Sequence, residues 1–193
     1  MKNKAERTKD ALVEGAMRII VKQGFEGTSF TEIVKATGIN RALISYHFGG
    51  KEDLIVSVTN YVIGRGQQIT QELLQKRTET DLIERYVRVT FDWVRNDPAH
   101  MSYLILAMQR GSYDEEIRKI VDQTFQTARN GIMQMLLNQP SLDERQRRML
   151  AVEIHSTLLG HIMNMLFAGM EHLDQFEERA VAATRALVEM RIH

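Results

Sequence analysis

Apolar residues recur along this chain at every third or fourth position, and the strict alternation of apolar and polar residues that marks a half-buried strand is absent. This period predicts an all-α protein, because residues three and four apart share one face of a helix. Glycines and two prolines interrupt the pattern and divide it into nine helices. The predicted helices lie at about residues 8–23, in two short stretches between 28 and 50, from 51 to the low seventies, and at 81–96, 98–109, 114–138, 142–168 and 174–191.

Residues 28–54 carry the most specific local signals. Ser29 and Glu32 have the spacing of a capping box, in which each side chain bonds the backbone N–H of the other residue and closes a helix start. Gly38 suits the left-handed turn that follows a helix, and Asn40 suits the start of the next one. The segment therefore predicts two short helices joined by a tight turn.

The second of these short helices separates its residues onto two faces. Ile44 and Phe48 are one turn apart and fall on the buried side. The residues that point outward are Arg41, Ala42, Ser45, Tyr46 and His47. Two short helices with an exposed second member form a helix-turn-helix, whose second helix enters the major groove of DNA.

Basic and acidic residues are equal in number, 25 each, but they are unevenly distributed. Residues 1–51 hold nine Lys and Arg against five Asp and Glu, and residues 52–193 balance this excess of four positive charges. A basic N-terminal segment fits nucleic-acid binding, although a chance distribution of four charges is the alternative. We therefore expect a DNA-binding domain at 1–51 and a larger helical domain at 52–193.

The composition also argues against several kinds of protein. The 193 residues include no cysteine, so disulfides and thiol chemistry are excluded. No apolar run approaches the ~18 residues of a membrane span, and the N-terminal MKNKAERTKD has no apolar signal core. We expect a cytoplasmic protein that has no membrane partner.

Catalytic and metal-binding patterns are missing from the sequence. His155 and His161 are six residues apart and face different directions on a helix, so they do not form a metal pair. The chain has no nucleophile–base signature and no phosphate-binding loop. We therefore expect no metal, no cofactor and no enzyme activity. An enzyme and a helical module that binds protein are the competing interpretations.

A series of short matches resembles the TetR family of bacterial transcription repressors. They are Gly24-Phe25, Thr28-Ser29, Ile33, Gly38-Ile39, Arg41-Ala42, Tyr46-His47-Phe48 and Lys51-Glu52. The resemblance covers residues 8–54 and implies a nine-helix TetR-like fold with a C-terminal ligand-binding and dimerisation domain. It also implies a repressor that binds a palindromic operator as a homodimer and is released by a small-molecule effector. Alternatives are an activator and a regulator that answers to a protein partner. Ser45 and Val34 depart from the family pattern, which usually has an aromatic and a small residue there.

The resemblance and the residue chemistry together indicate the DNA contacts. Arg41 is the candidate for a base contact, because its planar fork matches O6 and N7 of guanine; a contact with phosphate alone is the alternative. Tyr46, His47 and Lys51 resemble the family's phosphate-binding residues, and a packed or capping role is the alternative for His47. The predicted DNA-binding residues are Thr28, Ser29, Asn40, Arg41, Ala42, Leu43, Ser45, Tyr46, His47 and Lys51.

Two further features near this segment have open interpretations. Lys2, Lys4 and Arg7 form either an arm for the minor groove or a charged tail. Gly64 and Gly66 lie within the fourth predicted helix, where each costs roughly 1 kcal/mol relative to alanine. They mark either a bend or the end of a helix that transmits ligand binding, or a plain helix break.

The last two predicted helices, at 142–168 and 174–191, are the expected homodimer face, as in the family. Their apolar stripes consist of Leu150, Ile154, Leu158, Met165, Val181, Leu187 and Val188. Burial within one chain is the alternative for part of each stripe. Ser141 and Glu144 have the spacing of a second capping box at the start of the first of these helices.

The C-terminal domain should also enclose an apolar cavity for the effector. Eleven methionines in a chain of this length fit an adaptable apolar lining. The candidate lining residues are Phe91, Trp93, Met101, Tyr103, Met108, Arg110, Phe125, His155, Met163 and Phe167. Core packing is the alternative for each apolar member, because apolar residues at helical spacing are usually core. An exposed or core position is the alternative for Arg110 and His155.

Overall fold

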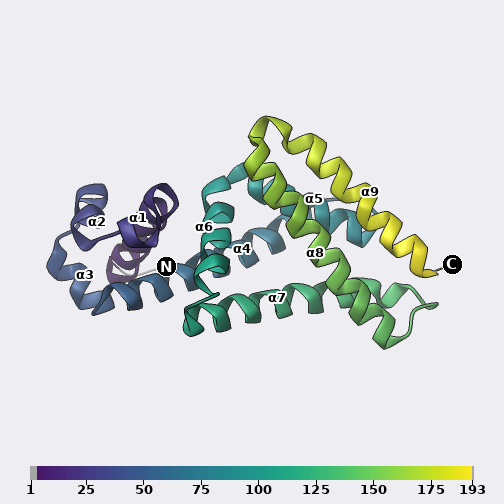
Figure 1. Cartoon of the computed structure of the whole chain (residues 1–193), viewed down its shortest axis with the longest axis horizontal. Helices are drawn as coiled ribbons and strands as arrows, with labels where there is room; N and C mark the ends of the chain where they lie inside the picture. Colours follow the sequence, from purple (N-terminus) through teal and green to yellow (C-terminus); the bar gives the residue numbers. More distant parts are fainter. Residues whose placement is uncertain (1–3, 193) are drawn as a thin grey trace. The chain divides into compact units, whose positions relative to one another are not determined.

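A computed structural model describes residues 4–192 of the chain, and this part is helical without any β-strand (Figure 1). The helices are α1 (Lys4–Gly27), α2 (Phe30–Thr37), α3 (Arg41–Phe48), α4 (Lys51–Lys76), α5 (Leu82–Asn96), α6 (Pro98–Arg110), α7 (Glu115–Met135), α8 (Glu144–Ala168) and α9 (Leu173–Ile192). The 3₁₀ helices η1 (Leu136–Asn138) and η2 (Met170–His172) follow α7 and α8. The prediction of an all-α chain with nine helices is confirmed. None of the helices in the described part is both long and apolar enough to cross a bilayer.

The chain divides into two compact units. The first unit contains Met1–Gln67 and Pro98–Val121, and the second unit contains Gln68–Asp97 and Asp122–His193. Consequently α6 and the beginning of α7 pack with α1, α2, α3 and most of α4. The functional division at residue 51 remains a prediction, because compact packing does not identify which segment binds which partner.

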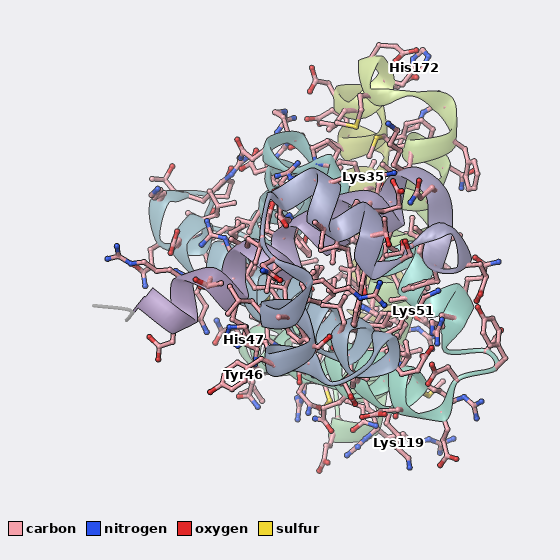
Figure 2. The ribbon with its side chains drawn as sticks, turned by 90° about the vertical axis from the view of Figure 1, so that its left-hand side faces the viewer. Lys35, Tyr46, His47, Lys51, Lys119 and His172 are labelled. Carbon is pink, nitrogen blue, oxygen red and sulfur yellow. The ribbon has the colours of Figure 1, made fainter. Side chains whose placement is uncertain are left out.

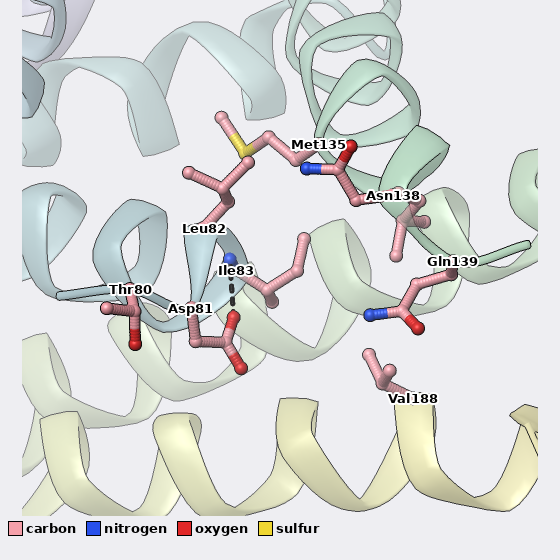
Figure 3. Close-up of a pocket in the computed structure, with 9 residues that line it drawn as sticks. Thr80, Asp81, Leu82, Ile83, Met135, Asn138, Gln139 and Val188 are labelled. Atoms are coloured by element: carbon pink, nitrogen blue, oxygen red, sulfur yellow. Dashed lines mark hydrogen bonds between the residues drawn. The ribbon is translucent and has the colours of Figure 1, made fainter.

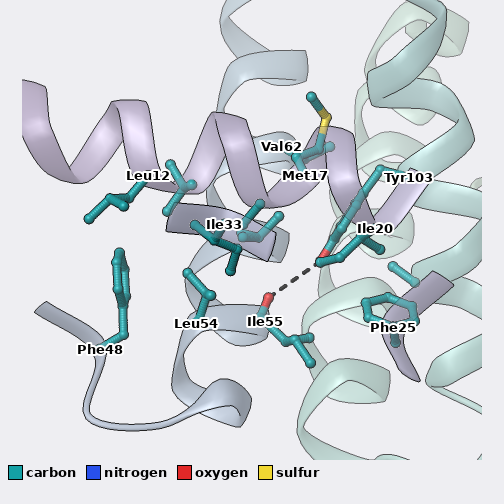
Figure 4. Close-up of a cluster of buried hydrophobic side chains, with 14 of the residues drawn as sticks. Leu12, Met17, Ile20, Phe25, Ile33, Phe48, Leu54, Ile55, Val62 and Tyr103 are labelled. Carbon is teal, nitrogen blue, oxygen red and sulfur yellow. Dashed lines mark hydrogen bonds between the residues drawn. The ribbon is translucent and has the colours of Figure 1, made fainter. Parts of the chain in front are cut away.

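The first unit has an apolar core to which each of its helices contributes (Figure 4). Leu12 of α1, Ile33 of α2 and Leu54 of α4 are buried in it. Ile44 and Phe48 of α3 join the same cluster, so α3 is anchored from behind by two side chains one turn apart. The short α3 therefore depends on this packing, since isolated helices of such length are unstable in water.

Tyr103 ties α6 to α4 inside this core. Its ring is fully buried, and its hydroxyl lies 2.8 Å from Thr59 Oγ1 and 3.4 Å from the carbonyl oxygen of Ile55 (Figure 4). Burial raises the pKa of the Tyr103 phenol well above its ordinary value. The neutral hydroxyl thus satisfies buried polar groups that would otherwise be costly.

The helix ends within the helix-turn-helix lie where the sequence predicts them, but only one of the two bonds of the predicted capping box at α2 is present, because the Glu32 carboxylate pairs with Lys35 at 2.9 Å. The Ser29 hydroxyl oxygen accepts a hydrogen bond from the Glu32 backbone N–H at 3.3 Å and caps α2. Gly38 has a φ of 68° and ends that helix in the left-handed conformation. The Asn40 side chain accepts from the Ala42 backbone N–H at 2.8 Å and caps α3.

The predicted capping box of α8 is wrong by two residues. Asp143 caps this helix instead of Ser141: its carboxylate accepts from the Gln146 backbone N–H at 2.7 Å, and the Gln146 side chain accepts from the Asp143 backbone N–H at 2.8 Å. Leu142 is buried in the core of the second unit, so the chain reaches that core before the helix begins. A carboxylate also interacts more favourably than a hydroxyl with the positive end of a helix.

The predictions for glycines in α1 and α4 have different outcomes. At Gly24 the backbone leaves helical geometry with a φ of 77°, at the position where the sequence predicts the end of the first helix. In contrast, α4 continues through Gly64 and Gly66. Their interpretation as a helix end or a plain helix break is therefore wrong, whereas their role as a bend remains a prediction.

The second unit combines an apolar core with ion pairs between α5 and α9. One buried apolar cluster of this unit contains Ile83, Ile132, Leu136, Leu142, Leu150, Ala151 and Ile154. Glu177 of α9 is buried and is paired with Arg88 and Arg95 of α5 at 3.1 and 2.7 Å. A buried carboxylate with two guanidinium partners holds the two helices in one register, because losing the partners would leave an uncompensated charge.

Candidate nucleic-acid interface

The α3 helix has one buried and one exposed face. Ile44 and Phe48 lie in the core, whereas Tyr46 is 82% exposed and Leu43 is 44% exposed. The other exposed positions of the helix are Arg41, Ala42 and Ser45. A helix supported from behind and free in front has the shape required to enter a major groove.

Tyr46 and His47 form an aromatic pair near the C-terminal end of α3. Their ring centroids are 5.3 Å apart in an edge-to-face arrangement, and both side chains lie beside each other in Figure 2. The His47 ring is half-buried and makes no hydrogen bond with the described part of the chain. Its nitrogens and the Tyr46 hydroxyl are therefore available to an acceptor outside the protein.

A cleft of about 330 Å³ lies at the start of α2. Its lining residues are Glu26, Thr28, Ser29, Phe30, Thr31, Arg41 and Lys51. Neither Arg41 nor Lys51 has an ion-pair partner among the residues that the structure describes. The first N–H groups of α2 add partial positive charge, so this cleft is suited to an anion such as phosphate.

Thr28 and Ser29, two of the three hydroxyl residues of the cleft, differ in what they can donate. Thr28 is buried, its hydroxyl donates to the carbonyl of Gly24 at 2.8 Å, and its backbone N–H donates to the carbonyl of Phe25 at 3.2 Å. Both donors of Thr28 are therefore used within the chain. Ser29 is exposed and its oxygen accepts the capping bond from Glu32, which leaves the hydroxyl proton free for a phosphate oxygen.

Three residues of the cleft were not predicted from the sequence: Glu26, Phe30 and Thr31. Phe30 and Thr31 are the first two residues of α2, so the predicted cap at Ser29 could have indicated them through their unpaired N–H groups. Glu26 had no such signal. Its carboxylate opposes an anion in the cleft and limits the net positive charge there.

The predicted basic arm overlaps the start of α1. Lys2 lies outside the described residues. Helix α1 begins at Lys4, and Arg7 is exposed on that helix. From Lys4 onward the backbone is therefore helical, which differs from an extended arm.

Comparisons with known proteins agree with this geometry. Residues 12–58 match the model of the bacterial regulatory proteins of the tetR family. The HTH-type transcriptional regulator YttP of Bacillus subtilis (strain 168) is 26% identical over 153 residues, which cover 79% of this chain and 72% of that protein. A transcriptional regulator of Rhodococcus sp. Rha1 has the same fold, with a TM-score of 0.77 and 14% identity over 92% of this chain and 93% of its own. The chain belongs to the TetR family.

This TetR-family chain shares its fold with a further solved regulator. A transcriptional regulator of Saccharomonospora viridis, crystallised in complex with choline, aligns with a TM-score of 0.73 and 16% identity. The alignment covers 91% of this chain and 94% of that one. Several other relatives of the TetR-family chain are named as transcriptional repressors. The family makes this protein a transcriptional regulator.

The effector-cavity candidates of the TetR-family chain are divided between its two units. Met101, Tyr103, Met108 and Arg110 belong to the first unit, whereas Phe91, Trp93, Phe125, His155, Met163 and Phe167 belong to the second. Tyr103 and Arg110 both lie against the ring of Phe25, with distances of 5.9 Å between the rings and 5.0 Å from the guanidinium carbon to the ring centre.

In the second unit the structure brings two of these candidates together. The rings of Phe125 in α7 and His155 in α8 are 4.9 Å apart in an edge-to-face arrangement. Burial and the nearby positive charge of Arg129 lower the pKa of His155 to about 4, so the imidazole is neutral at neutral pH. Phe167 is 83% exposed and encloses no cavity within a single chain.

Trp93 carries a polar group that the described chain does not satisfy. The side chain is buried, and its indole Nε1 has no hydrogen-bond partner among the described residues. A buried donor without a partner costs about 1–3 kcal/mol. A bound molecule that offers an acceptor would remove this cost, which distinguishes Trp93 from Phe91, its fully buried neighbour in α5.

A separate cavity of about 290 Å³ lies in the second unit (Figure 3). It is lined by Thr80, Asp81, Leu82, Ile83, Met135, Leu136, Asn138, Gln139 and Val188, and none of the predicted effector residues is among them. The Asp81 carboxylate is occupied there by its bond from the Ile83 backbone N–H at 2.8 Å. Within the described residues, no group of three acidic or histidine side chains is arranged to hold a metal.

Proposed function

We propose that this chain is a ligand-responsive TetR-family repressor, which binds a palindromic operator as a homodimer and is released by a small-molecule effector. Residues 1–51 serve as the DNA-binding domain and residues 52–193 as the ligand-binding and dimerisation domain. The observation that carries the proposal is the exposed face of α3 next to a cleft lined by Arg41 and Lys51, neither of which has an ion-pair partner within residues 4–192. The helix face that would enter the major groove therefore lies next to the cleft that would bind phosphate.

Base and phosphate contacts have separate sources in this proposal. Arg41 begins α3 and is exposed, so its guanidinium is placed for a guanine edge in the major groove. Lys51, the Ser29 hydroxyl and the first N–H groups of α2 hold one phosphate in the cleft, and Tyr46 and His47 hold another. Ala42, Leu43 and Ser45 face the bases in the major groove of DNA, whereas Asn40 and Thr28 form hydrogen bonds at the ends of helices.

Arg41→Ala should weaken operator binding by about 1–3 kcal/mol and relax specificity at a single operator position. The reason is that a bidentate contact distinguishes guanine from the other bases. Titration of duplexes that vary one base pair at a time measures both effects. If Arg41→Ala discriminates among these duplexes as the parent does, Arg41 contacts phosphate alone.

Lys51→Ala should weaken binding to all duplexes alike and reduce the salt slope of log Kobs by about one unit, because one phosphate contact is lost. Lys119→Ala is the matched control, since Lys119 lies outside the cleft and is paired with Glu115 on the surface of α7. Duplex titration over a range of salt concentrations gives the slope for each protein. Equal slopes for both variants would remove Lys51 from the phosphate site.

The surface of α8 supports the proposed dimer. Although residues on one side of this helix form the core, Met149 and Val152 are each 44% exposed and Phe167 is 83% exposed. An added Cβ at Gly160 would meet no atom within 4 Å, so this part of α8 is open in the single chain. Exposed apolar residues along a helix of this length are typical of a surface that pairs with another subunit.

The effector is proposed to bind in the second unit, near the unsatisfied indole of Trp93 and the neutral imidazole of His155. A choline complex of a protein with this fold supports small-molecule binding as a class of function. Because the sequence contains a single tryptophan, its fluorescence reports on this unit alone. Operator duplexes should first be selected from a random pool. Metabolites are then screened for release of the best duplex together with a change in tryptophan emission.

A further inference from the structure

The sequence suggests Arg110 as a lining residue of the effector cavity, but the structure gives this side chain other partners. It is the last residue of α6 and is buried in the first unit, where its guanidinium has three separate contacts. Nε donates to Asp114 at 2.9 Å, and Nη2 donates to the carboxylate of Glu52 in the first turn of α4. The guanidinium plane also covers the ring of Phe25 at 5.0 Å. All three of these partners belong to the first unit.

Asp114 keeps this guanidinium in a fixed orientation. One carboxylate oxygen accepts from the Ile117 backbone N–H at 3.1 Å, at the start of α7, and the other accepts from Arg110. Although burial alone would raise it, these two bonds hold the pKa of Asp114 below its ordinary value. Asp114 is therefore a charged partner, and the planar fork of Arg110 directs Nη2 at Glu52.

Two of the residues that Arg110 contacts are sequence neighbours of residues that line the anion cleft. Phe25 precedes Glu26, which lines the cleft at the α1–α2 corner. Glu52 follows Lys51, which lines it from α4. The Glu52 side chain is 68% exposed, so without Arg110 its carboxylate would be an unpaired negative charge one residue after Lys51.

We propose that Arg110 is a positioning residue for duplex binding: it holds the Glu52 carboxylate away from the cleft and neutralises it, so that Lys51 and the start of α2 can accept phosphate. This inference rests on the proposed DNA-binding function. It assigns α6 a direct influence on the phosphate site through one side chain. This positioning role requires arginine specifically, because a lysine ammonium cannot bridge Glu52 and Asp114 in the same planar arrangement.

The test is a double-mutant cycle measured by duplex titration across salt concentrations. Arg110→Met should weaken binding to every duplex about tenfold and flatten the salt slope, without changing the preference among operator variants. Glu52→Gln alone should change parent binding less than about twofold, yet it should restore the Arg110→Met protein by about fivefold. Arg110→Lys should lie between Arg110→Met and the parent. Arg18→Met, which removes an exposed arginine paired with Glu14, is the control and should bind as the parent does.

Each departure from this pattern has a defined meaning. If Glu52→Gln gives the same gain in both backgrounds, the two charges act independently and the positioning role is overturned. Duplex binding by Arg110→Lys or Arg110→Met that is as strong as the parent's would also overturn the positioning role. If Arg110→Met fails to fold by circular dichroism, Arg110→Lys with and without Glu52→Gln completes the same cycle. Failure of the parent protein to bind any duplex would contradict the proposed DNA-binding function, not the positioning role.

Discussion

A chain that carries Val152→Glu and Phe167→Glu should be monomeric at micromolar concentration and should bind its operator about a hundredfold more weakly than the parent. Both side chains are exposed on α8, so the single chain loses little core packing. In a two-fold interface each glutamate would be introduced twice and buried without a partner, which is costly. A monomer then places only one α3 on a half-site and loses the second half-site.

Light scattering and operator titration measure the two parts of this prediction. Gln123→Glu with Gln134→Glu is the matched control, because it introduces the same two charges at exposed positions of α7. The control should remain dimeric and bind as the parent does. A parent protein that is already monomeric, or a doubly substituted α8 that still dimerises, would contradict the proposed interface.

The helix-turn-helix could be predicted almost completely because its signals are local. A cap at Ser29, a left-handed turn at Gly38 and a cap at Asn40 each depend on residues within one turn of the chain. The spacing of Ile44 and Phe48 then determines which face of α3 is buried. Local chemistry and tertiary packing require the same conformation here, so propensity is not overridden.

The start of α8 shows how tertiary packing selects among local signals. Ser141 and Asp143 are both acceptable caps, with a glutamate or glutamine three residues later. The burial of Leu142 decides between them, and this burial depends on α5, α7 and α8 meeting in one core. A single sequence does not contain that information in a local form.

Arg110 shows the same limit at the functional site. From the sequence it is a lone arginine in an apolar helix, which suggests a group that orients a ligand. Its partner Glu52 lies 58 residues earlier, so only the fold brings the two charges together. The positions of the predicted effector residues also depend on the fold: Phe125 and His155 meet across two helices, whereas Phe167 lies on the surface.

The stability of the second unit should fall as the solution is acidified through the range in which His155 titrates. The pKa of His155 is about 4 in the folded protein, whereas the ordinary value of 6.5 applies to the unfolded chain. Between these two pH values the imidazole is therefore protonated more in the unfolded chain than in the folded one. The free energy of unfolding is therefore unaffected by His155 above pH 6.5 and decreases as the pH falls from 6.5 to about 4. Below about pH 4, protonation of His155 lowers it no further. The total contribution is roughly 2–4 kcal/mol.

His155→Leu should flatten this pH dependence, because leucine fills much of the same buried space beside Phe125 and does not titrate. The free energy of unfolding is measured by urea titration at several pH values between 4 and 6.5 for parent and variant. His172→Ala is the control, since that ring is exposed, and it should keep the slope of the parent. Carboxylates that titrate in acid contribute equally to all three proteins, so the difference in slope isolates the imidazole. Equal slopes for parent and His155→Leu would mean that the pKa of His155 is the same in the folded and the unfolded chain, which would contradict the burial of a neutral imidazole beside Phe125.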